Sequence, residues 1–199
     1  QGYNWFKINY LILYFMEITF LTGNEDKINS ARKAFEKFPQ IDVKFEKVET
    51  IEIQSMDVKE VSEFAVKEAA NRLKKSVFKV DTGYYFEGLN GYPGALVKFF
   101  NKFLTSEDIL ILLKGKSRKV CVKECLSFCE PEKEPISFLV SVDATILNSP
   151  EGEGGSIDRI IQYEGFEHSQ AACDYNDIIE YWNKKLNHYE QFANYLVAK

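Results

Sequence analysis

The chain has 199 residues, 45% of them hydrophobic and 28% charged, and a formal net charge of −5. This length and composition are typical of one globular domain with a substantial core, and the acidic balance argues against a nucleic-acid-binding surface. Four cysteines do not suggest a disulfide framework in a chain of this size, so we expect a reducing compartment, the cytoplasm.

Residues 1–15 fit poorly with the sequence that follows them. Their apolar run, Tyr10–Phe15, is far shorter than the ~20 residues needed to cross a bilayer, and it lacks the basic start and small-residue cleavage site of a signal peptide. We therefore expect no membrane partner. Residues 1–15 are interpreted as a non-native or upstream extension, with a genuine extra segment as the alternative, and residues 16–199 as one domain.

A strand, a glycine turn and a helix follow one another at the start of this domain. Glu17–Leu21 has the pattern of a strand, and Asn24 is a natural N-cap for the helix after it. The apolar face of that helix consists of Ile28, Ala31, Phe35 and Phe38. Free N–H groups at a helix N-terminus favour phosphate. The candidate anion site consists of Thr22, Gly23, Asn24 and Lys27; the alternative is an ordinary strand-to-helix join.

The next segment predicts a second strand, a polar loop and a second helix. Ile41–Glu49 alternates as a strand does, and Asp57 with Glu60 has the spacing of a capping pair. The apolar stripe of the helix is Val58, Val61, Ala65, Ala69 and Leu73. Lys67 falls roughly opposite this stripe, where a solvent-facing lysine is the default. Glu52 in the loop is a candidate ligand, with a solvated acid as the alternative.

The central stretch of the chain has the strongest signs of a site. Ser76–Val80 has the pattern of a strand, which places Asp81 at the strand end and Thr82-Gly83 in a turn. Ligands of open α/β sheets collect at such carboxyl ends. Asn90–Gly94 is dense in residues that turn the backbone and allow a ligand to approach it closely, and Lys98 follows. These residues indicate an anionic-ligand site; a solvated or capping acid is the alternative.

The remaining elements are two helices and a hairpin. Phe99–Leu113 and residues 174–197 have helical patterns, and Lys119–Cys129 with Ser137–Leu147 predicts a β-hairpin. Three cysteines spaced by four on the first hairpin strand are expected to pack as small apolar groups. Any metal in this chain should be a hard cation held by carboxylates.

Several of these motifs resemble one family. The segments Thr22-Gly23-Asn24 with Lys27, Glu52-Ile53-Gln54, Asp81-Thr82-Gly83, Leu89–Gly94 and Lys98 stand in the order and spacing of the HAM1-like inosine triphosphate pyrophosphatase family, in its archaeal type. The resemblance covers about residues 16–165. Val80 stands where the family usually has an acid, the aromatic residue that stacks on the purine is lost near Asp158, and Trp182-Asn183-Lys184-Lys185 replaces a Ser-His-Arg step.

The resemblance implies an α/β fold in which a long mixed β-sheet splits into two lobes flanked by helices, with a nucleotide cleft between them, as in ITPase/Maf-like proteins. It also implies a homodimer that hydrolyses nucleoside triphosphates of deaminated purines (ITP, dITP, XTP) to the monophosphate and pyrophosphate with Mg²⁺. The alternative is a nucleotide-binding relative with an altered substrate or lost catalytic activity.

The same resemblance assigns roles to individual residues. Glu52 and Asp81 are expected to hold Mg²⁺, and Asp81 and Lys67 are the candidate catalytic residues. Candidate substrate-binding residues are Thr22, Gly23, Asn24, Lys27, Thr82, Gly83, Lys98 and Asp158. Asp158 is retained from the family's aromatic-Asp-Pro step. Trp182 is a candidate to stack on the base, with Lys184 or Lys185 in place of the missing arginine; a core tryptophan and two solvated lysines are the alternatives.

Overall fold

The computed structural model describes residues 16–199, so the interpretation of residues 1–15 lies outside the described residues. The strands are β1 Met16–Leu21, β2 Ile41–Glu46, β3 Val77–Phe86, β4 Pro93–Gly94, β5 Lys119–Cys129, β6 Ile136–Ile146 and β7 Ile161–Tyr163. The helices are α1 Glu25–Phe35, α2 Val58–Leu73, α3 Val97–Phe103, α4 Ser106–Leu112, α5 Tyr175–Lys185 and α6 His188–Val197, with short 3₁₀ turns at Glu87–Leu89 and Gln170–Ala172.

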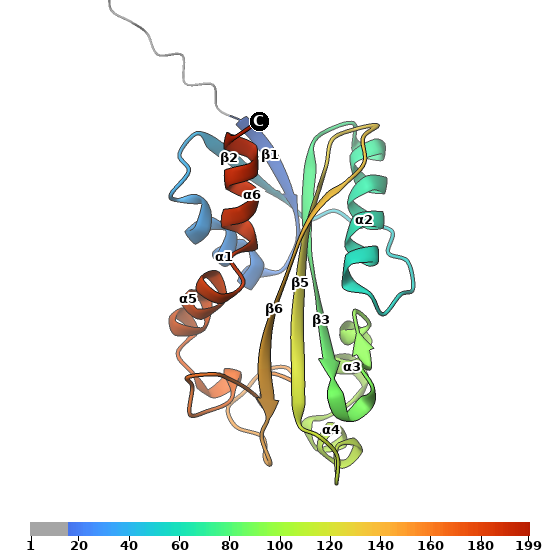
Figure 1. Cartoon of the computed structure of the whole chain (residues 1–199), viewed down its shortest axis with the longest axis vertical. Helices are drawn as coiled ribbons and strands as arrows, with labels where there is room; N and C mark the ends of the chain where they lie inside the picture. The colour runs from blue at the N-terminus through green and yellow to red at the C-terminus, as the bar shows by residue number, and fades with distance from the viewer. Residues whose placement is uncertain (1–15) are drawn as a thin grey trace, which may run out of the picture.

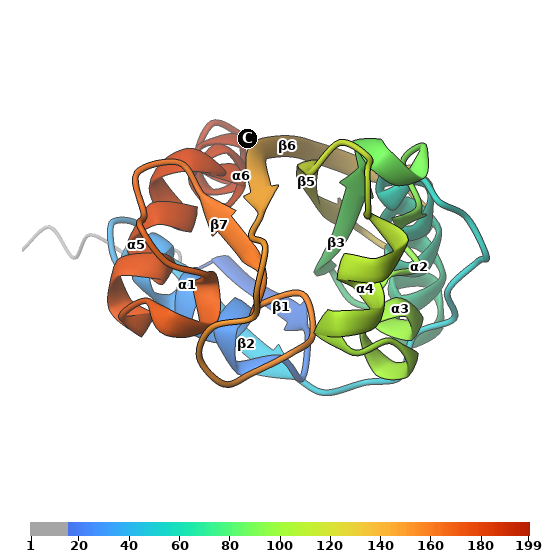
Figure 2. The same cartoon turned by 90° about the horizontal axis from the view of Figure 1, so that it is seen from below.

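The strands form one mixed sheet in the order β2-β1-β3-β5-β6-β7, with β4 paired to β3. β1 pairs in parallel with β2 and β3, whereas β3, β5 and β6 form a long antiparallel ribbon. Helices α1, α5 and α6 lie on one side of this ribbon and α2, α3 and α4 on the other (Figures 1 and 2). The expected α/β class with a long mixed sheet is confirmed. Within residues 16–199, every helix is too short or too polar to span a membrane.

The edge of β3 that faces β1 is only partly paired. β1 pairs with β3 at Val77 and Phe78, and β4 pairs with it at Tyr84 and Tyr85. Among the described strands, none pairs with residues 79–83 on that side, although β5 pairs with them on the other. We call residues 79–83 the open edge of β3, and it contains the Asp81-Thr82-Gly83 motif.

The length of β3 corrects one prediction from the sequence. Asp81 was placed at a strand end, with Thr82-Gly83 as a turn, but all three residues lie inside β3. The strand continues because each of its ten residues has a partner on β5, from Val77 opposite Cys129 to Phe86 opposite Val120. This pairing cannot be predicted from the local sequence, because β5 begins 33 residues after the end of β3. The local strand pattern is also interrupted by Thr82-Gly83.

Two predicted helices are each divided into two. The predicted helix 99–113 is α3 and α4, because Thr105 caps α4 in a reciprocal box with Asp108. The predicted helix 174–197 is α5 and α6, because Asn187 has a left-handed backbone, with φ of 40°. The hairpin of β5 and β6 is confirmed, the second strand ends at Glu46 rather than at Glu49, and β7 was not predicted.

Aromatic side chains hold α1 and α6 onto the sheet. The rings of Phe20 on β1 and Phe78 on β3 stack at 4.4 Å, and Phe192 of α6 lies 5.0 Å from Phe78. Phe35 of α1 packs edge-on against Phe192 at 6.3 Å. All four belong to one buried cluster, which fixes the first and last helices of the described chain on the same face of the sheet.

We expect Phe78→Ala to lower the free energy of unfolding by about 3–5 kcal/mol, because it leaves a cavity among three other phenylalanine rings. Urea unfolding monitored by circular dichroism measures this change. Phe103→Ala is the control, since the Phe103 side chain on α3 is 70% exposed and its loss should change stability by less than about 0.5 kcal/mol. Equal losses in the two variants would contradict the packing described here.

Candidate active site

The loop between β1 and α1 is held by its own side chains. The Thr22 hydroxyl accepts a hydrogen bond from the Asn24 N–H at 3.1 Å, and the Asn24 side chain accepts one from the Lys27 N–H at 3.0 Å. The predicted N-cap at Asn24 is therefore confirmed. Gly23 lies against the aliphatic part of Lys47, where a Cβ would come within 3.0 Å of two carbon atoms. The loop is consequently fixed in front of the helix N-terminus.

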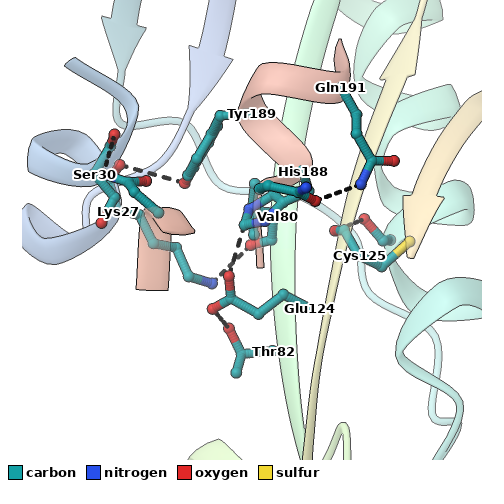
Figure 3. A network of polar contacts seen from close by, with 12 residues as sticks. Lys27, Ser30, Val80, Thr82, Glu124, Cys125, His188, Tyr189 and Gln191 are labelled. Atoms are coloured by element: carbon teal, nitrogen blue, oxygen red, sulfur yellow. Dashed lines mark hydrogen bonds and ion pairs between the residues drawn. The ribbon is translucent and has the colours of Figure 1, made fainter. Parts of the chain in front are cut away.

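Lys27 connects this loop to the open edge of β3. Its ammonium group donates a hydrogen bond to the carbonyl oxygen of Val80 at 2.7 Å (Figure 3). The side chain of Val80 is 3% exposed and packs in the core, so only its backbone oxygen faces Lys27. The candidate anion loop and the Asp81 motif, which are far apart in the sequence, are therefore adjacent in the structure.

On the α2 side of β3, a buried lysine lies between two acids. The Lys79 ammonium pairs with a carboxylate oxygen of Glu52 and lies 3.2 Å from Oδ1 of Asp81. The side chains of Lys79 and Asp81 are only 10% and 16% exposed, whereas that of Glu52 is 48% exposed. The sequence analysis paired Glu52 with Asp81 but missed Lys79. Its signal was the Lys-x-Asp spacing, which places both side chains on one face of a strand.

The second oxygen of Asp81, Oδ2, is buried and has no hydrogen-bond partner in the described structure. A buried carboxylate oxygen without a donor is costly unless a ligand, ion or water completes it. No group of three or more His, Cys, Asp or Glu residues within 16–199 could hold a metal by itself. Mg²⁺, however, is commonly held by one or two carboxylates together with substrate phosphates. Asp81 and Glu52 fit that shared mode of binding rather than a metal cage built by the protein alone.

The opposite face of the same strands carries a second polar group. Thr82 of β3 donates a hydrogen bond to Oε1 of Glu124 on β5 at 2.9 Å, and Oε2 of Glu124 lies 3.4 Å from Nε2 of His188 (Figure 3). His188 begins α6 and is 2% exposed, and neither ring nitrogen has a hydrogen bond within residues 16–199. Burial lowers the pKa of the His188 imidazole, an effect that Glu124 opposes and Lys27 reinforces.

Glu124 and His188 were not singled out from the sequence. The Ser-His-Arg step was sought at residues 182–185, but the histidine that lies beside the Asp81 motif is His188, within Asn187-His188-Tyr189. The signal for Glu124 was the one acid in β5, a strand whose other polar residues are two lysines and a serine. The local sequence does not predict that Glu124 and His188 contact each other, because that contact depends on how β5 and α6 pack against β3.

The glycines of the central motif pack against protein backbone. A Cβ on Gly83 would lie 3.2 Å from the amide nitrogen of Ala95, so its absence allows β4 to approach β3. Gly94 has a φ of 58°, and a Cβ there would lie 2.5 Å from the carbonyl oxygen of Met56. The turn at residues 90–94 therefore joins the start of α2 to β3, and the close approach predicted for a ligand is made by Met56. Lys98, in α3, is exposed.

Four predicted site residues lie apart from Asp81, and three of them have partners elsewhere. Lys67 pairs with Glu134, in the turn between β5 and β6, at 2.7 Å. Asp158 accepts hydrogen bonds from the Gly155 N–H and from Gln170, and burial raises the pKa of its carboxyl group. Trp182 is partly buried, with its ring edge-on to Tyr163 at 6.4 Å, and Lys184 is exposed. In this arrangement none of the four makes a polar contact with Asp81.

A wide groove on the described surface lies away from the Asp81 motif. It has a volume of about 890 Å³ and is lined by residues of β5, β6 and β7, including Cys121, Asp143 and Gln162. Of the residues that the sequence analysis considered for the site, Lys185 alone lines it. We place the candidate site at the open edge of β3, because the paired buried charges of Lys79 and Asp81 and the unpartnered Oδ2 of Asp81 lie there. A groove without such groups does not by itself define a site.

Comparison with known proteins agrees with the motifs. The model of the Ham1 family matches residues 18–177. The dITP/XTP pyrophosphatase of Thermococcus kodakarensis is 33% identical over 185 residues, which cover 91% of this chain and 97% of that protein. The inosine triphosphate pyrophosphatase of Candida glabrata is 28% identical, with coverage of 88% and 96%.

Solved structures give the same fold. The HAM1 protein of Coxiella burnetii has a TM-score of 0.77 at 18% identity, over 92% of this chain and all of its own. The Ham1 protein of Staphylococcus aureus has a TM-score of 0.73 at 22% identity, over 92% of this chain and 98% of its own. The architecture is thus that of the Ham1 proteins. By its sequence over residues 18–177, the chain belongs to the Ham1 family.

The burial of His188 predicts a pH-dependent stability. Because burial lowers its folded-state pKa below the ordinary value of 6.5, the unfolded chain binds the proton more readily. The stability that depends on neutral His188 is complete above pH 6.5 and is lost as the pH falls through the folded-state pKa. The slope from one proton is at most about 1.4 kcal/mol per pH unit.

Urea unfolding at pH 7.5, 6.5 and 5.5 measures this effect. We expect His188→Gln to flatten the decline in stability that the wild-type protein shows below pH 6.5, whatever its absolute stability. His168→Gln is the matched control, because the side chain of His168 is 63% exposed, and it should keep the wild-type slope. A wild-type slope in His188→Gln would contradict the assignment.

Proposed function

We propose that this protein hydrolyses the triphosphates of deaminated purines (ITP, dITP and XTP) to the nucleoside monophosphate and pyrophosphate, with Mg²⁺. The names of its Ham1-family relatives, dITP/XTP pyrophosphatase and inosine triphosphate pyrophosphatase, support this substrate class. The structural observation that carries the proposal is the meeting of two motifs: Lys27 from the anion loop contacts the open edge of β3, which bears Asp81.

In this proposal the triphosphate lies between the β1–α1 loop and the open edge of β3. The N-terminus of α1 and the Lys27 ammonium stabilise negative charge that develops on the phosphates. Thr22 and Asn24 fix the loop in which those donors lie. Lys98 and Lys67 reach the phosphates only if their side chains change conformation, since Lys98 is exposed and Lys67 pairs with Glu134.

Asp81 is proposed as the central catalytic residue. Its buried Oδ2 has a free lone pair with which to accept a proton or orient a water molecule beside the α-phosphorus. Mg²⁺, when bound by Asp81, Glu52 and phosphate oxygens, would draw negative charge from the phosphates. The alternation of β3 keeps the Asp81 carboxylate on one face, while Thr82 and its partner Glu124 lie on the other.

The base is proposed to lie near the start of α6. His188 has two ring nitrogens without partners in the described residues, and the resemblance assigns the family's histidine to contacts with base and phosphate. Because the Trp182 ring packs against Tyr163, Trp182 borders this region and is not free to stack on a base. A homodimer remains a prediction.

The alternative is a nucleotide-binding relative with an altered substrate or lost activity. One observation favours it: Val80, at the position where the family usually has an acid, is buried among apolar residues and cannot contribute a charge. Whether Asp81 and Glu52 suffice is decided by turnover.

The first experiment measures pyrophosphate release from ITP, dITP, XTP, ATP and GTP with Mg²⁺. We expect the deaminated purines to be preferred, and Asp81→Asn to lower the rate about 10²–10⁴-fold without unfolding the protein. Asp42→Asn, which removes an exposed acid paired with Lys44 on β2, should leave the rate unchanged. An unchanged rate in Asp81→Asn would remove Asp81 from the mechanism. Nucleotide binding without turnover would establish the alternative.

We expect Lys27→Met to reduce kcat/KM about 10–100-fold, the loss typical of one charge-assisted hydrogen bond to a phosphate. Steady-state kinetics with ITP checks this. Lys33→Met is the control on the same helix, because Lys33 is exposed and pairs with Glu180, and it should retain full activity. Similar kinetics in both variants would place the phosphates elsewhere.

A further inference from the structure

Lys79 is an unusual residue for the interior of this sheet. It is 8% exposed, and its ammonium group contacts Glu52 and Asp81, the two acids to which the proposed function assigns Mg²⁺. A buried lysine of this kind is stable only when paired. Its partners, Glu52 and Asp81, are the two acids that the proposed function assigns to the metal.

The net charge of the cluster formed by Lys79, Glu52 and Asp81 determines which ions it can bind. Two carboxylates and one ammonium leave a single net negative charge. A divalent cation entering the nucleotide-free protein must come close to the Lys79 ammonium or expel it. Like charges at such short range in a partly buried site repel strongly, since the protein interior screens them less than water does.

A bound triphosphate changes this balance. Its oxygens bring several negative charges to the same place, and these accommodate both the ammonium and the divalent cation. Oδ2 of Asp81 has no hydrogen-bond partner in the described residues, while Oδ1 faces Lys79. The carboxylate can therefore serve both cations at once, provided that phosphate completes the charge.

We propose that Lys79 is an internal counter-ion that occupies the metal-binding acids in the free protein, so that the divalent cation binds appreciably only together with the nucleotide. This inference rests on the proposed function for the identity of the metal ligands. Lys79 is a positioning residue here: it acts through Asp81 and Glu52. The consequence is ordered binding, in which the metal enters as the metal–nucleotide complex.

The test measures the binding of Mn²⁺, a paramagnetic ion with similar preference for oxygen ligands, to the protein without nucleotide. Electron paramagnetic resonance counts the free ion directly and does not depend on activity. The variants are Lys79→Met, which removes the ammonium group, and Lys79→Arg, which keeps a positive charge. Lys75→Met is the control, because Lys75 also forms an ion pair, with Glu46, but its side chain is 37% exposed and it contacts neither Glu52 nor Asp81.

We expect Lys79→Met to bind Mn²⁺ at least about tenfold more tightly than the wild type, and Lys79→Arg and Lys75→Met to bind it as weakly as the wild type. Adding Asp81→Asn to Lys79→Met should abolish the gain. With a non-hydrolysable ITP analogue present, the wild type should bind Mn²⁺ as well as Lys79→Met does. Circular dichroism checks folding; if Lys79→Met does not fold, Lys79→Gln replaces it.

Equal and tight Mn²⁺ binding by the wild type and Lys79→Met would overturn the inference and leave the metal site intact. A gain in Lys79→Met that Asp81→Asn does not abolish would also overturn it, since the new site would lie elsewhere. The proposed function fails separately, if the wild type releases no pyrophosphate from any triphosphate. In that case the tenfold gain would still establish Lys79 as the counter-ion of Asp81 and Glu52.

Discussion

The divided edge of β3 is the constraint on which the rest of this structure depends. β1 leaves β3 after Phe78, and β4 reaches it only at Tyr84, so that five residues in the middle of the sheet keep an unpaired backbone edge. Open edges in the interior of a sheet are uncommon because unpaired backbone groups are costly. Here the Lys27 ammonium bonds one of the carbonyls. In the proposed function, this edge is where the charged ligand is held.

The alternation of β3 then separates two kinds of chemistry. Lys79 and Asp81 face α2 and the loop that carries Glu52, whereas Thr82 faces Glu124 and His188. Buried charges on the first face are paired with one another, and on the second face a buried histidine is kept neutral by its surroundings. The two groups share a strand but no side-chain contact, so a substitution on one face need not disturb the other.

Much of the site is local in origin and could be predicted. Asn24 caps α1 because of its own short side chain, and the order of Thr22-Gly23-Asn24 and Asp81-Thr82-Gly83 is visible without a structure. What could not be predicted depends on pairing between distant segments. The continuation of β3 through Asp81 follows from its ladder with β5, and the contact of Glu124 with His188 follows from the docking of α6. The capping box at Thr105, by contrast, was a local signal that was overlooked.

Helix α6 joins the site to the core through two residues four positions apart. His188 lies beside Glu124, and Phe192, on the same face one turn later, is fully buried among Phe78, Phe35 and Phe128. The last helix of the chain therefore cannot leave the sheet without withdrawing His188. A ligand that touches His188 adds its binding free energy to the anchoring of the C-terminus. Under the proposed function, a nucleotide that contacts His188 should in this way slow the exchange of amide hydrogens along the whole of α6.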